Sequence, residues 1–97
     1  MSTLRTNTIT IRGRSFTVAE LSAKGVRDSR KVNEKEPYRF DLFVASLSAV
    51  EPKFTEAELA DEPNIFAKKI AAEALRLTAI DESEKPNDPK PEAPTLD

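Results

Sequence analysis

The sequence predicts a small α+β domain, mostly helical, in which an N-terminal β-hairpin is followed by three to four short helices and a disordered C-terminal tail. Three observations predict this class. Residues 8–18 hold two runs of alternating polar and apolar residues around a glycine, which is typical of a hairpin. Residues 37–79 repeat apolar side chains at helical spacing. Residues 81–97 are acidic and rich in proline, and such a composition does not support a packed core.

Size and composition limit the architecture and the chemistry. The 97 residues make one domain at most, which we place at residues 1–80. A core this small is marginal, so a homo-oligomer is expected to add stability. The chain has no His and no Cys, which removes the usual zinc sites and most nucleophile–base pairs. No apolar run reaches the roughly 18 residues of a membrane span, so we expect a soluble cytoplasmic protein without membrane contact.

The hairpin is expected at about residues 8–19. Gly13 separates its two runs and permits the positive φ that a tight turn requires. Alternation places four apolar side chains on one face, which consists of Ile9 and the predicted core residues Ile11, Phe16 and Val18. Because a lone hairpin is only marginally stable, this face must pack on a helix or on another hairpin.

A first helix is predicted from Ser22 to about Val32. Ser22 is a suitable N-cap, and Leu21 and Val26 occupy the two positions of a hydrophobic staple. Gly25 lowers the stability of this helix by about 1 kcal/mol relative to alanine. The rest of the helix is polar and basic.

The central helix, Pro37 to Val50, is the element around which the chain is organised. It has two nearly opposite apolar faces, and a helix that is apolar on two sides is usually buried on two sides. The richer face, assigned to the core, consists of Phe40, Phe43, Val44, Leu47 and Val50. The leaner face, a candidate contact surface for a second copy or a client helix, consists of Tyr38, Leu42, Ala45 and Ala49. The alternative is that helices of the same chain cover both faces.

Two further helix starts follow. Thr55 and Glu58 have the spacing of a capping box, and Phe54 and Leu59 that of a staple, which predicts a short helix. Pro63 then suits the first turn of a longer helix that ends near Ala79.

The last helix has one apolar stripe, which contributes Phe66, Ile70 and Leu77 to the predicted core. Alanines on the same stripe permit close approach of the bulky side of the central helix. Ile65 and Leu75 lie off the stripe and are further candidates for subunit contact.

The acidic residues show no catalytic or metal-binding pattern. They lie at predicted helix caps and on solvent faces, and the cluster around Glu58 lacks the spacing and the glycine of a calcium loop. We therefore expect no catalytic residue, no metal, no cofactor and no enzymatic activity.

The main alternative to a protein-binding function is a small nucleic-acid-binding or regulatory protein. Residues 1–35 hold eight basic and three acidic side chains, a balance that favours contact with phosphates. No aromatic residue is interleaved with Arg27, Arg30 and Lys31, so nucleic acid is the less favoured partner.

Two segments resemble the small tail assembly chaperones of long-tailed bacteriophages of the siphovirus type. The first, residues 9–22, is a hairpin followed by Leu21-Ser22. The second, residues 44–77, is a helix, then Val50-Glu51-Pro52, a Phe-Thr-Glu helix start and a final helix. The resemblance implies a protein that binds the tape measure protein, keeps it soluble and helps to recruit tail tube protein during tail assembly. It also implies action in the host cytoplasm and absence from the mature virion.

Overall fold

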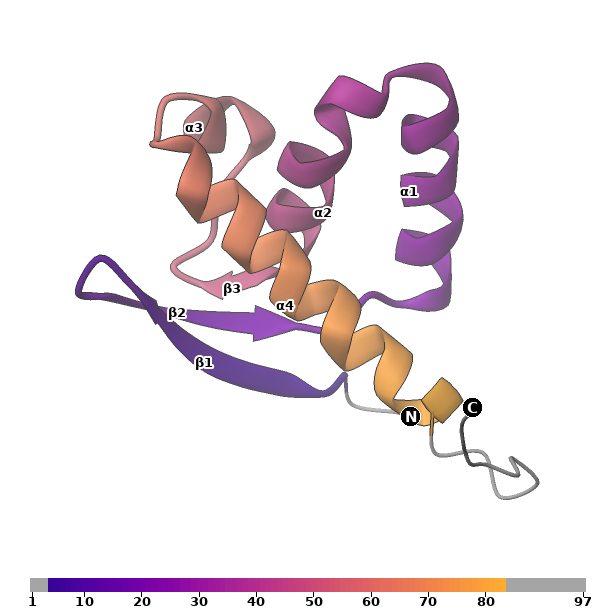
Figure 1. Cartoon of the computed structure of the whole chain (residues 1–97), viewed down its shortest axis with the longest axis horizontal. Coiled ribbons are helices and arrows are strands. Elements are labelled where there is room, and N and C mark those ends of the chain that lie inside the picture. Colours follow the sequence, from indigo (N-terminus) through magenta and orange to yellow (C-terminus); the bar gives the residue numbers. More distant parts are fainter. Residues whose placement is uncertain (1–3, 84–97) are drawn as a thin grey trace, which may run out of the picture.

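The structure, a computed structural model that describes residues 4–83, has an α+β fold in which helices pack over a small antiparallel sheet (Figure 1). The strand order is β1-β2-β3, with bounds of Thr6–Ile11 (β1), Arg14–Ala19 (β2) and Ala49–Glu51 (β3). The helices are α1 (Ala23–Lys35), α2 (Phe40–Ser48), α3 (Glu56–Ala60), α4 (Asn64–Ser83) and the 3-10 turn η1 (Pro37–Arg39). The predicted fold class is confirmed, whereas β3 is an addition. The predicted disordered tail lies outside the described residues, except that residues 81–83 belong to α4.

The hairpin turn has two central residues. Ile11 pairs with Arg14, and the residues between them, Arg12 and Gly13, have φ of 51° and 79°. Positive φ at both positions is the geometry of the type I′ turn, whose twist matches that of the flanking strands. Gly13 adopts it without cost, whereas Arg12 is a side-chain-bearing residue in the left-handed region.

The helix starts are set by local hydrogen bonds. The Oγ of Ser22 accepts from the backbone N–H of Gly25 at 3.0 Å, which confirms the predicted N-cap of α1. At α3, the N–H of Glu58 donates to Thr55 Oγ1 and the N–H of Thr55 donates to Glu58 Oε1, which completes the predicted capping box.

The segment predicted as one central helix is divided into three elements. η1 leads into α2, which ends at Ser48, and Ala49 begins β3, which pairs antiparallel with β2. Val50 therefore lies in a strand and not on the rich face of a helix. The difference is non-local, because Ala49 and Glu51 pair with Val18 and Thr17 of β2, about 30 residues earlier in the chain.

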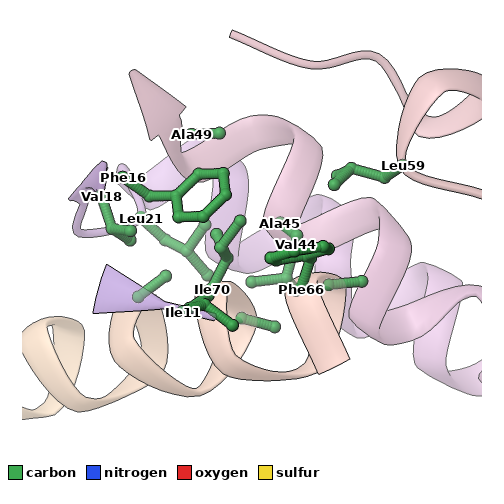
Figure 2. Packing of buried hydrophobic residues seen from close by; sticks show 13 residues of the cluster. Ile11, Phe16, Val18, Leu21, Val44, Ala45, Ala49, Leu59, Phe66 and Ile70 are labelled. Atoms are coloured by element: carbon green, nitrogen blue, oxygen red, sulfur yellow. The ribbon is translucent and has the colours of Figure 1, made fainter. Parts of the chain in front are cut away.

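The core lies between the sheet, α2 and α4 (Figure 2). Phe16 is at its centre, with the ring centroids of Phe66 and Phe54 at 5.4 and 6.1 Å. Six of the nine predicted core residues are buried as expected, namely Ile11, Phe16, Val18, Phe66, Ile70 and Leu77. Hence the hairpin face and the α4 stripe were predicted correctly.

The other three, all from α2, correct the prediction. Leu47 is 47% exposed, so its assignment to the core is wrong. Phe43 is only partly buried and lies outside the core cluster, while Phe40 is partly buried against the edge of this cluster. The side of α2 that faces the core carries Val44, Ala45 and Ser48 instead, because pairing of β3 with β2 fixes the rotation of the helix. No helix within residues 4–83 is long and apolar enough to cross a membrane.

Candidate partner-binding surface

The predicted contact face of the central helix does not form one surface. Ala45 and Ala49 are both buried within the core cluster, which corrects their assignment as partner-binding residues. Their small side chains do permit close approach of a helix, as expected, but the helix is α4 of the same chain. The alternative left open by the sequence, that the chain covers this face itself, therefore holds for these two alanines.

The remaining predicted contact residues are separated from one another. Tyr38 is 77% exposed and lines, with partly buried Leu42, a shallow cleft of about 220 Å³ against Leu59 and Ala67. Ile65 is partly buried and packs against the core cluster. Leu75 is 37% exposed and lies on α4 at a different groove.

That groove lies between α1 and the second half of α4. We call it the helix groove. Its volume is about 270 Å³, and it is lined by Leu21, Val26, Ser29, Arg30, Asn33, Phe40, Leu75, Thr78 and Ala79. The lining residues of α1 recur at helical spacing, so they lie along one side of the helix.

Hydrogen bonds close one end of the helix groove. The backbone N–H of Leu21 donates to Thr78 Oγ1 at 2.9 Å, and this hydroxyl donates in turn to the carbonyl of Ala74 at 2.7 Å. On the α1 wall, the hydroxyl of buried Ser29 donates to the carbonyl of Val26. The hydroxyl groups of Thr78 and Ser29 are thus satisfied within the chain.

An arginine holds the elements that support α1. The Arg39 guanidinium in η1 donates to both carboxylate oxygens of Glu56 at the start of α3 and to Glu36 at the end of α1. Hydrogen bonds to Glu56 and then to Glu36 raise the pKa of Arg39 above its ordinary value. Since α1 packs chiefly on η1 and α2, this contact fixes the wall of the groove farther from the sheet.

Helix α1, which forms one wall of the helix groove, is positively charged. α1 carries five basic residues (Lys24, Arg27, Arg30, Lys31 and Lys35) against Asp28 and Glu34, a net charge of +3. Arg30 lies at the rim and forms no ion pair with any residue of 4–83. A partner with an acidic flank is therefore favoured over a basic one.

A second apolar surface was missed in the sequence because its residues were assigned to the core. Leu47 and Val50 are 47% and 44% exposed. Leu47 and Leu4 also border a cleft of about 150 Å³, whose other lining residues include Glu20, Lys24 and Asp28. These charges make this cleft less suited to an apolar partner than the helix groove.

The helix groove could not be found from the pattern of any single helix. The hydrophobic staple accounts for Leu21 and Val26, and the rich face of the central helix accounts for Phe40. Of the apolar groove residues, only Leu75 had no predicted role inside the domain. The tertiary arrangement brings these residues together. Within the described residues, no group of three or more acidic, His or Cys side chains is arranged to hold a metal ion. Comparison with protein families, with curated proteins and with solved structures finds no match to this chain.

Proposed function

We propose that this chain is a tail assembly chaperone of a long-tailed bacteriophage, and that it binds a helix of the tape measure protein in the helix groove. The proposal combines the resemblance of residues 9–22 and 44–77 with one observation, a groove between two helices that contains the apolar side chains of Val26, Phe40 and Leu75. An amphipathic helix binds such a groove through apolar residues at positions i, i+3 or i+4, and i+7.

The groove suggests how the client is kept soluble. The apolar stripe of an unassembled tape measure helix would be covered by Val26, Phe40 and Leu75, while the charged outer face of α1 stays in water. Arg30 at the rim would favour an acidic residue beside the client stripe. Recruitment of tail tube protein then requires a surface outside the groove, for which the exposed pair Leu47 and Val50 is the candidate.

The test is co-purification with a tape measure fragment. Leu75→Glu places a charge on the groove wall at a partly exposed site, so the variant should fold but lose the fragment, since burial of an unpaired charge is costly. Leu47→Glu is the matched control, because it makes the same change at an exposed leucine outside the helix groove. Equal retention of the fragment by both variants would refute the groove as client site.

The nucleic-acid alternative predicts a different response to salt. A phosphate-binding surface loses affinity steeply as salt rises, whereas binding through apolar burial does not. Retention of the tape measure fragment from low to high salt, with no binding of duplex DNA or RNA, supports the chaperone. Salt-sensitive binding of nucleic acid, weakened by Arg30→Gln and unaffected by Leu75→Glu, would favour the alternative.

A further inference from the structure

Strand β1 forms one edge of the sheet, because the strand order is β1-β2-β3 (Figure 1). In an antiparallel pair, residues that exchange both backbone hydrogen bonds alternate with residues that exchange none. Ile11 and Arg14 close the two-residue turn and are a hydrogen-bonded pair. Arg5 lies six residues before Ile11, so the alternation predicts that it too is hydrogen-bonded to the neighbouring strand segment. The N–H of Glu20 does donate to the carbonyl of Arg5 at 2.8 Å.

The register therefore identifies the backbone groups that face outward. Residues 5, 7, 9 and 11 use their N–H and C=O groups toward β2. The N–H and C=O groups of the intervening residues point to the open side of β1, and these residues are Thr6, Thr8 and Thr10. All three side chains are exposed.

This edge lacks the devices that usually prevent strand pairing. Protected edges carry charges, proline or a bulge, or are very short. The β1 sequence Thr-Asn-Thr-Ile-Thr-Ile has no charge and no proline, and its pairing with β2 is continuous from Thr6 to Ile11. The opposite edge is protected, because β3 spans only Ala49–Glu51, ends on a charge and is followed by Pro52.

We propose that β1 pairs antiparallel with β1 of a second copy of this chain, about a two-fold axis at Thr8. Only residues whose backbone N–H and C=O groups point to the open side of β1 can form hydrogen-bonded pairs across such an axis. Thr8 therefore lies opposite the partner's Thr8, and Thr6 lies opposite the partner's Thr10. This register uses all of the outward-facing threonines. A shift by two residues in either direction would leave one threonine of each copy unpaired.

The chemistry of the strand favours a second copy over a strand of another protein. An isologous interface must be self-complementary, and a strand without charge meets its own copy without repulsion. The exposed side chains of Thr6, Thr8 and Thr10 would form a continuous row of threonines, a type of cross-strand pair that stabilises sheets. The two-fold pairing also covers the β1 edge of both copies at once. The sheet of the dimer then ends on each side at the short strand β3.

The groove beside β1 is consistent with this partner. It has a volume of about 340 Å³ and runs between β1 and α4, where Ile9 is only partly buried. In the proposed register the partner's Asn7 lies beside Ile9 and covers it. Of the charged groove residues, Glu73 and Arg76 are already paired within the chain, which leaves Lys69 without an ion pair among the described residues.

Cysteine cross-linking tests the register, and the cysteine-free chain makes the result specific. Hydrogen-bonded partners have Cα atoms about 5.5 Å apart, which suits a disulfide. Thr8→Cys should form a covalent dimer under mild oxidation. Thr6→Cys and Thr10→Cys should each form no covalent dimer alone and should cross-link to each other when mixed. Thr17→Cys on β2 is the control, since it lies on the same face one strand inward and should not cross-link.

Analytical ultracentrifugation tests the dimer itself and needs no client. A negative result would therefore contradict the proposed dimer without contradicting the proposed chaperone function. The full chain should sediment at twice its mass of 10.8 kDa. Thr8→Lys, which sets like charges opposite each other on the axis, should restore the monomer, and Ser15→Lys on β2 should not. A monomeric wild-type chain, a dimer that Thr8→Cys does not cross-link, or equal cross-linking of all three variants would overturn the proposal.

Discussion

Arg39 holds both carboxylate oxygens of Glu56, with distances of 3.1 Å from Nε to Oε2 and 2.8 Å from Nη2 to Oε1. The two residues lie on η1 and α3, and the third guanidinium nitrogen reaches Glu36 at the end of α1. One planar side chain therefore joins three elements of the chain.

Replacement of Arg39 by lysine keeps the charge but removes the two-pronged contact. An ammonium group cannot match both carboxylate oxygens at once, so the melting temperature should fall although the net charge is unchanged. Thermal unfolding measures the change, and Arg27→Lys, at an exposed pair between neighbouring residues, is the control. Equal melting temperatures for Arg39→Lys and wild type would show that the charge alone is sufficient.

Two large aliphatic residues, one predicted correctly and one not, should differ strongly in their effect on stability. Ile70 is fully buried, and Ile70→Ala should lower the free energy of unfolding by about 2–5 kcal/mol. Leu47→Ala should change it by about 0.5 kcal/mol or less, as for other surface sites. Chemical denaturation of both variants measures the contrast, and a large cost at Leu47 would return this residue to the core.

Gly25 of α1 is a site where alanine should stabilise the fold. A methyl group there would lie 3.4 Å from Ser22 Oγ and 3.5 Å from two carbons of Leu21, which are ordinary contacts. Gly25→Ala should therefore raise the free energy of unfolding by about 1 kcal/mol through helix propensity. Gly13→Ala should have the opposite effect. The φ of 79° at Gly13 is unfavourable for a residue with a side chain, so this variant should be less stable than wild type.

Ser48 has a buried hydroxyl without a hydrogen-bond partner among the described residues. Removal of this hydroxyl also removes the cost of burying it, so Ser48→Ala should raise the free energy of unfolding by about 1 kcal/mol. Ser46→Ala is the matched control on the same helix, because the Ser46 hydroxyl donates to the carbonyl of Phe43 at 2.8 Å. A loss of stability at Ser48 would instead indicate that its hydroxyl has a partner in solution.

Glu73 should make the stability depend on pH in the acidic range. Hydrogen bonds from Arg76, and then from Asn7, lower the pKa of Glu73 in the folded chain. Stability from this group is therefore complete above the unfolded pKa of about 4.3 and is lost as pH falls through the lower folded pKa.

The measurement is the difference in stability between wild type and Glu73→Gln as a function of pH. The difference should be present at pH 7 and shrink as pH falls below about 4.3. Glu34→Gln on the exposed side of α1 is the control and should change stability little at any pH. A difference between wild type and Glu73→Gln that stays constant with pH would contradict the assigned cause.

The sequence predicted the parts of the fold that depend on local contacts. The turn at Gly13, the N-cap Ser22 and the capping box of Thr55 and Glu58 all involve residues within about one helical turn or one hairpin. Each is stabilised by neighbours in the chain, so its pattern is complete in the sequence.

The rotation of α2 and the existence of β3 could not be predicted in the same way. A helix with apolar side chains on two sides has more than one rotation that buries a similar area, and pairing of Ala49 with Val18 decides between them. This pairing involves residues far apart in the chain and a strand too short for its own pattern. The candidate groove depends on the same tertiary arrangement, so only Leu75 among its residues was identified as a contact.

The hydrogen bonds of the Thr78 hydroxyl make the two ends of the helix groove different. Because it accepts from Leu21 and donates to Ala74, the beginning of α1 is tied to α4 and the two walls cannot part there. The far end of α1 is held by Arg39 to α3 and not to α4, so a client in the proposed groove would enter from that side. Thr78→Val, of nearly the same size, would remove both bonds, and faster amide hydrogen exchange at Leu21 would show that the groove had become open at both ends.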